Sequence, residues 1–264
     1  MTATAQKRAS SMTAKSAKAR LDVVVAERGL APSREQARRL ILAGLVFVNG
    51  KRADHAGTLV RPESQIEVTG REHDYVSRGG VKLAGALDAF AVEPRDRICA
   101  DVGASTGGFT DCLLQRGARL VHAIDVGYGQ LAWKLRTDPR VVVHERVNVR
   151  RMEPGVLDPA PSLAVIDASF ISLRLLLGPT LGQLTEGGEI VALVKPQFEV
   201  GRERVGKGGV VRDASAREEA VASVVAAGEE LGLALRGVAE SPIAGAKKGN
   251  VEVFVHLDRR KARG

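Results

Sequence analysis

Cysteine and aromatic residues are scarce in this sequence. Its 264 residues include two cysteines, Cys99 and Cys112, which lack C-x-x-C spacing and have no histidine near them. We therefore expect neither a zinc site nor a disulfide framework, and we expect a reducing, cytoplasmic compartment. Phe, Trp and Tyr together make up 3% of the chain, which argues against broad aromatic platforms for stacked bases.

Long apolar runs are also absent. No run approaches the ~20 apolar residues that a membrane-spanning helix requires, and the N-terminal segment lacks the apolar core of a signal peptide. We therefore expect no membrane insertion. The chain is 44% hydrophobic and 27% charged, a composition typical of a globular protein with one large domain or two ordinary ones.

Positive charge is concentrated near the N-terminus. Residues 1–80 carry 14 Lys and Arg against 8 Asp and Glu, a net +6, whereas residues 81–264 carry 25 against 23, a net +2. Residues 1–19 are basic and rich in Ser, Thr and Ala, which predicts a disordered arm. Such an arm is either a solvated tail or a non-specific contact for nucleic-acid phosphates.

Residues 20–70 show the pattern of a small α+β domain. A short helix over 21–28 is expected to end at Gly29. A second helix should begin after Ser33, whose side chain suits the N-cap position, and should end at Gly44. The apolar residues of this second helix recur at helical spacing, so one of its faces should pack on a core.

Strand signals follow the second helix. Residues 45–48 are apolar and lead into Asn49-Gly50, a pair typical of a tight hairpin turn. Further strands are expected near residues 57–60 and 65–68. Residues 71–81 are largely polar and have no clear period, which predicts an interdomain linker.

Basic side chains gather on the second predicted helix. Arg34 and Arg38 share one face at i, i+4 spacing, with Arg39 beside them. Such a face either tracks RNA phosphates or is simply solvated. The run RLD…SREQARRLILAGLVFVNGK resembles the S4 RNA-binding domain. This resemblance implies an S4-like α+β domain that presents its second helix and its hairpin to structured RNA.

Residues 82–264 alternate strand and helix patterns. Apolar runs typical of strands buried on both faces occur at 98–102, 120–126, 141–143, 163–166 and 190–194. Helices are expected at 109–115 and 214–231, and residues 251–257 alternate like an antiparallel edge strand. The pattern predicts the α/β fold class, with a mostly parallel sheet in a doubly wound, Rossmann-like domain.

Ligands of such a sheet bind at the carboxyl ends of its strands. The loop from Gly103 to Gly108 follows one strand, and Asp125 ends the next, a spacing that suits a nucleoside ribose. NAD, an adenine nucleotide and S-adenosylmethionine all fit this pattern. The loop has no Gly-Lys-Ser/Thr ending and no G-x-G-x-x-G spacing, which disfavours a P-loop and a dinucleotide. Asp101 suits an ammonium group better than a pyrophosphate.

Several further segments match one known family in order. They are YVSRGGVKLAGAL, DVGASTGGFTDCLL, AIDVGYGQL, IDASFISL, VKPQFEVGRERVGKGGVVRD and SPIAGAKKGNVEVFV. From about residue 20 to residue 257 the chain resembles the TlyA family, also called haemolysin A-like proteins. These are S-adenosylmethionine-dependent ribosomal RNA 2′-O-ribose methyltransferases. The resemblance implies an S4 domain, then an FtsJ/RrmJ-like class I methyltransferase domain over 82–264, with S-adenosylmethionine as the cofactor.

The resemblance also implies a catalytic set. The matching motifs place a Lys-Asp-Lys-Glu group on Lys82, Asp167, Lys195 and Glu252. Two lysines held close together disfavour each other's charge, so we expect Lys195 to activate the attacking hydroxyl. Asp167 would orient that hydroxyl and favour the cationic methyl donor, while Lys82 and Glu252 would position the ribose.

Binding residues are expected in two groups. Those predicted to contact the cofactor are Asp101, Gly103, Ser105, Gly107, Gly108, Asp125, Asn148 and Phe170. Those predicted to contact RNA are Arg20, Arg34, Arg38, Arg39, Lys51 and Arg78. The basic, glycine-rich residues 202–212 form a predicted loop that either contacts RNA or covers the site. No metal site is expected, and the histidines are interpreted as core or edge residues.

The sequence therefore predicts methyl transfer from S-adenosylmethionine to a ribose 2′-hydroxyl of ribosomal RNA. The resemblance implies cytidine in 16S and/or 23S RNA, with ribosomal subunits as partners and a monomeric enzyme. One alternative is a non-catalytic S4 protein that binds RNA or assists ribosome assembly. Two weaker alternatives are a haemolysin, which no amphipathic membrane stretch supports, and a nucleotide-dependent oxidoreductase.

Overall fold

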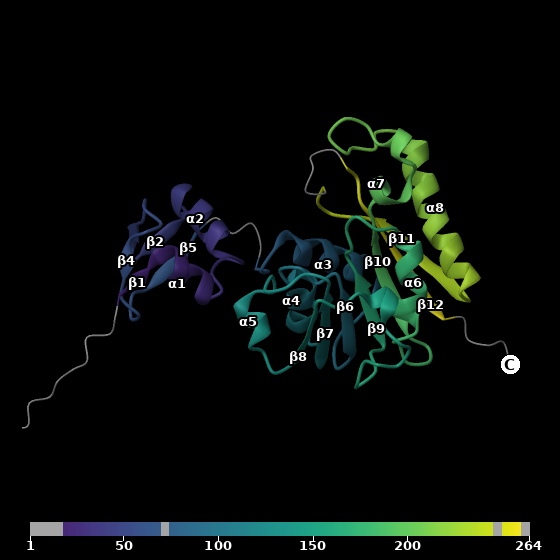
Figure 1. The fold of residues 1–264 in the computed structure, drawn as a ribbon, viewed down its shortest axis with the longest axis horizontal. Helices are drawn as coiled ribbons and strands as arrows, with labels where there is room; N and C mark the ends of the chain where they lie inside the picture. The colour runs from purple at the N-terminus through teal and green to yellow at the C-terminus, as the bar shows by residue number, and fades with distance from the viewer. Residues whose placement is uncertain (1–17, 70–73, 245–249, 260–264) are drawn as a thin grey trace, which may run out of the picture.

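The computed structural model describes residues 18–69, 74–244 and 250–259. Figure 1 shows a small lobe, residues 18–69, beside a large lobe made of the remaining described residues. Most of the predicted basic arm (1–17) and part of the predicted linker (70–73) lie outside the described residues. Two of the three hydrophobic cores belong to the large lobe and one to the small lobe.

The small lobe packs two helices against short strands. Its elements are β1 (Ala19–Arg20), α1 (Leu21–Glu27), α2 (Arg34–Leu42), β2 (Val46–Val48), β3 (Lys51–Arg52), β4 (Leu59–Val60) and β5 (Ile66–Val68). The core between them is apolar and includes the fully buried Leu21, Val25, Ile41 and Val46. The apolar stripes of both helices thus provide the burial that short helices need to be stable.

Local signals in the small lobe behave as the sequence predicts. The Ser33 hydroxyl accepts a hydrogen bond from the Gln36 backbone N–H at 3.2 Å, which caps α2. Asn49 and Gly50 adopt φ values of 50° and 75° in the β2–β3 turn, as a tight hairpin requires. The strand predicted near 57–60 is β4, which pairs with β1 and lies outside the β3-β2-β5 sheet.

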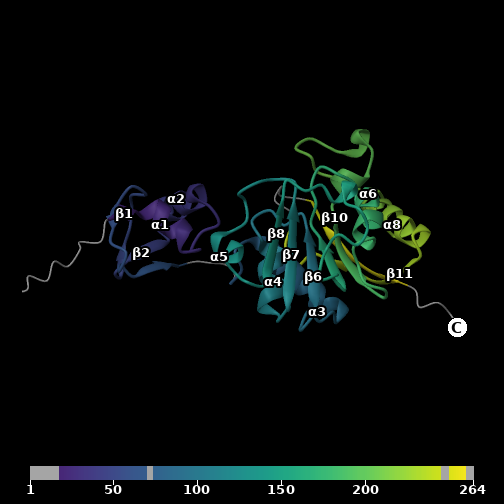
Figure 2. The ribbon, with the colours of Figure 1, turned by 60° about the horizontal axis from the view of Figure 1, so that its bottom comes forward.

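The large lobe contains a seven-stranded sheet in the order β11-β12-β10-β9-β6-β7-β8. Its strands are β6 (Ile98–Val102), β7 (Leu120–Asp125), β8 (Val141–Glu145), β9 (Leu163–Ile166), β10 (Glu189–Val194), β11 (Leu233–Glu240) and β12 (Val253–Arg259). The strands from β10 to β8 are parallel, and β6, β7 and β8 run side by side in Figure 2. This arrangement confirms the predicted α/β fold class.

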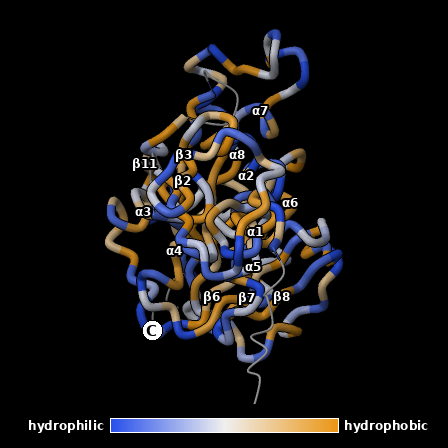
Figure 3. The backbone as a smooth tube through the Cα atoms, turned by 90° about the vertical axis from the view of Figure 1, so that its left-hand side faces the viewer, coloured by the Kyte–Doolittle hydropathy of each residue, from blue (hydrophilic) through white to orange (hydrophobic). Residues whose placement is uncertain are grey.

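Helices cover both faces of this sheet. They are α3 (Arg78–Phe90), α4 (Gly108–Gln115), α5 (Trp133–Arg136), α6 (Arg174–Leu181), α7 (Pro196–Glu199) and α8 (Ala214–Glu230), with 3-10 turns η1 (Val149–Arg151) and η2 (Arg202–Arg204). The core of one face includes residues of α3, α4 and α5, and the other includes residues of α6 and α8. Figure 3 shows hydrophobic residues along β6 and β7 and hydrophilic residues on many surrounding loops.

The chain order reverses beside β6. From β6 the chain passes to β7 and β8 on one side, and then crosses to β9 and β10 on the other. Loops that leave adjacent strands in opposite directions open a crevice at the carboxyl ends of those strands. The loop after β6 and the residues after β9 therefore flank the place where a ligand is expected.

Two expectations about this lobe need correction. The predicted edge strand, now β12, is antiparallel as expected, but it lies between β10 and β11 and is not an edge. The edge strand on this side of the sheet is β11, which was not predicted because its polar and apolar residues give no clear strand period. In addition, α3 begins at Arg78, within the stretch predicted as linker, and packs against α4. Among the described residues, no helix is both long and apolar enough to cross a membrane.

Candidate active site

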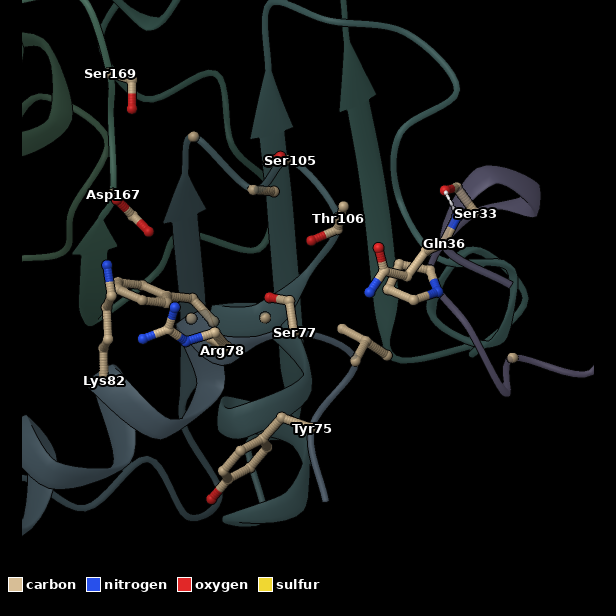
Figure 4. Close-up of a pocket in the computed structure, with 18 of the residues that line it drawn as sticks. Ser33, Gln36, Tyr75, Ser77, Arg78, Lys82, Ser105, Thr106, Asp167 and Ser169 are labelled. Atoms are coloured by element: carbon tan, nitrogen blue, oxygen red, sulfur yellow. Dashed lines mark hydrogen bonds between the residues drawn. The ribbon is translucent and has the colours of Figure 1, made fainter. Parts of the chain in front are cut away.

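A pocket of about 650 Å³ lies at the carboxyl ends of β6, β9 and β10. Its walls come from the loop after β6, the start of α3 and three of the four predicted catalytic residues (Lys82, Asp167 and Lys195), with the α1–α2 region of the small lobe on the far side. Figure 4 shows Lys82 and Asp167 on one side of this pocket and Ser33 and Gln36 on the other. The volume is in the range of pockets that hold cofactors and other small molecules.

The four predicted catalytic residues form two ion pairs. Lys195 Nζ lies 2.5 Å from Asp167 Oδ1, and Lys82 Nζ donates to Glu252 Oε2 at 2.5 Å. Asp167 and Lys195 directly follow the adjacent parallel strands β9 and β10, so the sheet itself places them side by side. Lys82 lies in the first turns of α3, and Glu252 directly precedes β12.

The two pairs differ in their surroundings. The side chains of Lys82 and Glu252 are 11% and 4% exposed, and Glu252 does not line the pocket. Asp167, at 22% exposed, lines the pocket together with Lys195. Lys195 also donates to Ser169 Oγ at 2.9 Å. Lys195 is therefore the lysine that is already in contact with a hydroxyl group, while Lys82, which also lines the pocket, pairs with the more deeply buried Glu252.

The loop after β6 approaches these residues closely. Gly103 adopts φ +87°, and a Cβ atom there would lie 2.7 Å from the Asp167 backbone oxygen. Gly107 also has positive φ, at +93°, and Gly108 packs its backbone on Gly79 and Gly80. Side chains at Gly103 and Gly108 would push the loop away from the residues after β9 and from the start of α3, and one at Gly107 would clash with Leu135 of α5. Gly103, Ser105 and Gly108 line the pocket, as predicted for cofactor-binding residues.

Asp101 lies beneath this loop. The residue is fully buried, its Oδ2 accepts a hydrogen bond from Thr110 Oγ1 at 2.6 Å, and its buried Oδ1 has no hydrogen-bond partner among the described residues. Burial raises the pKa of Asp101 to about 7, because a desolvated carboxylate is disfavoured. An unpartnered buried oxygen next to a pocket fits a cationic ligand.

Asp125 is tied to the same loop. Its Oδ2 accepts from the Ser105 N–H at 2.8 Å and its Oδ1 accepts from the Gly127 N–H at 2.6 Å. Each carboxylate oxygen has a second acceptor site, so ribose hydroxyls can still bind there. The orphaned Asp101 oxygen, the glycine cradle and the half-buried Asp125 together fit the ammonium and ribose ends of S-adenosylmethionine.

Five residues predicted to contact the cofactor do not line the pocket: Asp101, Gly107, Asp125, Asn148 and Phe170. The first three lie in or beside the loop after β6, and the other two lie elsewhere. Asn148 accepts from the Arg150 N–H at 3.1 Å and caps η1 with its side chain. Phe170 is 91% exposed, has φ +66° and lies beside Phe198 with 5.2 Å between ring centroids. Phe170 therefore lies on the exposed side of the loop that carries Ser169, and its contact with the cofactor stays a prediction.

The predicted RNA-binding residues fall in several places. Arg20 and Arg34 both pair with the buried Asp22 of α1. Arg39 pairs with Glu35 one turn earlier on α2. The other three residues of this prediction, Arg38, Lys51 and Arg78, are all exposed. Arg78 stands apart from the small lobe, because it begins α3, lines the pocket and donates to the Ala244 carbonyl at 3.3 Å.

The loop over residues 202–212 is partly anchored. Arg204 pairs with Asp213 and Glu219 at the start of α8. The buried Asn250 accepts from the Val211 N–H and donates to the Gly209 carbonyl, which connects the loop to the segment that holds Glu252. The loop is therefore attached near the catalytic residues at one end. Its predicted contact with RNA stays a prediction.

Sequence reasoning missed some of the residues that build this site. Ser169 was not identified, although it follows Asp167 by two positions and lies on the same strand-end loop. Asp22 was also missed, because a single acid in a basic segment gives no sequence signal of its burial. His122 and His256 are buried, in line with their interpretation as core or edge residues.

Both lobes match known families. Residues 75–259 match the FtsJ-like methyltransferase family, and residues 19–66 match the S4 domain. The protein is therefore an FtsJ-like methyltransferase that carries an N-terminal S4 domain. This class agrees with the pocket geometry, in which a glycine loop and the Lys195–Asp167 pair face the same space.

Comparison with individual relatives identifies the family of the whole chain. It is 50% identical over 241 residues to the 16S/23S rRNA (cytidine-2′-O)-methyltransferase TlyA of Mycobacterium tuberculosis, covering 91% of this chain and 90% of the relative. It is 42% identical to Hemolysin A of Brachyspira hyodysenteriae, covering 90% and 99%. A solved Streptococcus thermophilus structure, provisionally described as a hemolysin, is 46% identical, with a TM-score of 0.71 and coverage of 93% and 90%. The chain belongs to this TlyA family, as its motifs predict.

Proposed function

We propose that this protein transfers a methyl group from S-adenosylmethionine to a ribose 2′-hydroxyl of ribosomal RNA. The observation that carries this proposal is the single pocket shared by the glycine loop, Lys195 and Asp167. A reaction between a cofactor and a large RNA needs both to meet at one place, with the attacking oxygen in line with the bond between the methyl group and its sulfur. The description of the M. tuberculosis relative supports cytidine in 16S and 23S rRNA as the target.

The cofactor would lie along the loop after β6. S-adenosylmethionine supplies an electrophilic methyl group on a cationic sulfur. Gly103, Ser105 and Gly108 would hold its methionine end, and Asp125 would accept hydrogen bonds from its ribose. The free oxygen of Asp101 would face positive charge, which favours a cation over a neutral ligand.

The attacking hydroxyl would approach Lys195. Lys195 Nζ already contacts Ser169 Oγ and Asp167 Oδ1, so it is oriented by two neighbours on the adjacent strand-end loop. As the oxygen–methyl bond forms and the methyl–sulfur bond breaks, the hydroxyl proton must leave. Lys195, once it has lost one of its own protons to solvent, would orient the hydroxyl and receive that proton. Asp167 would hold Lys195 in place, and the enclosed Lys82–Glu252 pair would fix the ribose.

Phe170 would contact the target nucleotide. Its ring is 91% exposed on the loop that carries Ser169, and it lies against Phe198 on the helix that follows Lys195. An exposed aromatic ring offers a stacking surface to an unstacked base. A base held there would place its ribose near the catalytic pair.

The small lobe would capture RNA. Its S4 domain carries Arg20, Arg34, Arg38, Arg39 and Lys51, all of them exposed or half-exposed. Phosphate contacts of this kind give affinity and position without reading sequence. We propose that the monomeric protein acts on ribosomal subunits in the cytoplasm, because that is where a bacterial-type ribosomal RNA substrate would be met.

The test is methyl transfer to defined ribosomal substrates. Purified protein is incubated with radiolabelled S-adenosylmethionine and with purified large or small subunits from cells that lack the gene, or with the extracted RNAs. The label is then mapped to a nucleotide and to base or ribose. Ribose label on rRNA is expected. Label on a base would overturn the proposed chemistry, and binding without any transfer would favour the non-catalytic S4 alternative.

A further inference from the structure

One carboxylate organises two arginines of the small lobe. Arg20 donates through Nε and Nη2 to the two oxygens of Asp22, each at 3.0 Å. Arg34 donates through Nε to Asp22 Oδ2 at 2.9 Å, and the Val23 N–H donates to Oδ1 at 3.1 Å. This Asp22 cluster, which consists of Asp22, Arg20 and Arg34, joins β1, the start of α1 and the start of α2.

The three side chains of the cluster are exposed very unequally. The Asp22 side chain is 3% exposed, whereas those of Arg20 and Arg34 are 48% and 59% exposed. The hydrogen bond from Arg20 is the main cause that lowers the pKa of Asp22 to about 2, so the carboxylate is ionised at neutral pH. The acid is therefore hidden, and the two guanidinium groups that it holds face outward.

The guanidinium groups are held in place by Asp22, but some of their N–H donors do not bond to it. Arg20 bonds side-on to the carboxylate and also lies close to Gly57, where a Cβ atom would be 3.2 Å from its Nη1. Arg34 reaches the carboxylate through Nε, which leaves its two terminal nitrogens available to a phosphate. A planar guanidinium fork that is fixed in advance loses less rotamer entropy when it binds a phosphate.

We propose that Asp22 is a positioning residue for RNA capture, which holds Arg20 and Arg34 ready for the phosphodiester backbone of structured RNA. This inference rests on the proposed function, because it requires that the small lobe binds ribosomal RNA. Asp22 itself would repel phosphates, so its effect on affinity runs through the two arginines that it orients. An acidic residue would thus contribute to RNA binding through the two basic residues that it orients.

The proposal and simple electrostatics predict opposite results. Removal of one negative charge from an RNA-binding surface should tighten binding if charge alone matters. If Asp22 positions the arginines, its removal should weaken binding although the net charge becomes more positive. The sign of the change in affinity therefore decides between the two.

The experiment compares Asp22→Asn with a matched control, Glu63→Gln. Glu63 is an exposed acid of the same lobe that lies 3.8 Å from Arg61, so its neutralisation adds the same charge without freeing a buried site. Affinity of the full-length chains for purified large and small subunits is measured across a series of KCl concentrations. We expect Asp22→Asn to bind about fivefold more weakly and with a shallower salt dependence. Glu63→Gln should bind as well as wild type or slightly better.

A second variant protects the test against unfolding. The double change Arg20→Lys and Arg34→Lys keeps every charge and leaves Asp22 paired, but it removes the guanidinium forks. We expect a similar loss of affinity in this variant, with thermal unfolding close to wild type. Unchanged affinity of the lysine variant, or tighter binding by Asp22→Asn, would overturn the positioning role. Wild-type protein that binds neither subunit would instead overturn the proposed function, and this inference with it.

Discussion

In the small lobe, the two arginines of the Asp22 cluster are exposed, while the Asp22 carboxylate that they share is buried. In the two ion pairs of the large lobe, by contrast, the lysines and the carboxylates are all largely shielded from solvent. The arginine side chains are 48% and 59% exposed, while Lys82 and Lys195 are each 11% exposed. Exposed charges act over about a Debye length and are weakened by salt, but enclosed charges act at contact distance. The comparison teaches that RNA capture should be sensitive to salt and the catalytic step much less so.

The largest effect is expected in the pocket. Replacement of Lys195 by alanine removes the group that contacts both Ser169 and Asp167, and it should lower methyl transfer by about a thousandfold. Affinity for ribosomal subunits should stay at the wild-type value, because the small lobe is untouched. Single-turnover transfer and subunit binding are measured on the same preparation.

The matched control for Lys195 is Arg140→Ala. Arg140 forms an ion pair with Asp138 away from the pocket, so its loss removes a pair without touching the chemistry. Full activity is expected for this control. Wild-type turnover by Lys195→Ala would show that Lys195 does not activate the hydroxyl. It would also contradict the assignment of catalysis to the enclosed pairs of the large lobe.

The next effect concerns the cofactor. In Gly103→Ala, the new Cβ atom would lie 2.7 Å from the Asp167 carbonyl, so the loop must move. We expect S-adenosylmethionine affinity, measured by calorimetry, to fall at least about tenfold, with subunit affinity retained. Gly187→Ala is the control, because Gly187 has φ +76° but nothing within 4 Å of an added Cβ. Equal losses in the two variants would show that backbone strain alone, and not the approach to Asp167, explains the effect.

A smaller effect should appear with pH. Burial raises the pKa of Asp101 to about 7, so its carboxyl gains negative charge as the pH rises through neutrality. A cationic cofactor prefers the ionised form, so its affinity should rise with pH, by about tenfold between pH 6 and pH 8. Calorimetry in buffers of different ionisation enthalpy should also detect proton release on binding. In Asp101→Asn this pH dependence should vanish, and its persistence would assign the titration to another group.

The smallest effect is expected from one exposed arginine. Arg34→Ala should weaken subunit binding about threefold and reduce the slope of log affinity against log salt by about one. Methyl transfer at saturating subunit concentration should be unchanged. Arg236→Ala serves as the control, because Arg236 is similarly exposed at 51% but lies on the edge strand β11 of the large lobe, where it pairs with Asp258 of β12. A slope that changes equally in both variants would argue for a general charge effect in place of a small-lobe contact.

Local structure was largely predictable because its causes are local. The Ser33 cap, the Asn49-Gly50 turn and the apolar runs of β6, β9 and β10 depend on residues within a few positions of one another. The glycine loop after β6 was equally visible, since positive φ at Gly103 restricts the choice of residue. Strand β11 was not predicted, because its pairing with β12 and not its own period makes it a strand.

The candidate site was only partly predictable. Family motifs pointed to four candidate catalytic residues, but they did not indicate which carboxylate each lysine contacts. The bond from Lys82 to Glu252 joins residues 170 positions apart. Likewise, the motif that contains Phe170 gave no sign that this residue would have positive φ and a ring that is 91% exposed. Such outcomes depend on the sheet order and on loop geometry.

By itself, the sequence determined the two-domain plan, the basic character of the first third and the identity of the residues that follow each strand. These properties depend on composition, period and short motifs. Only the tertiary structure decided that Asp167 and Lys195 meet, that Asp22 is buried beneath two arginines and that the glycine loop touches β9. The physical reason is that burial and ion pairing depend on which distant segments of the chain pack together. The pattern of residues within one segment does not determine that packing.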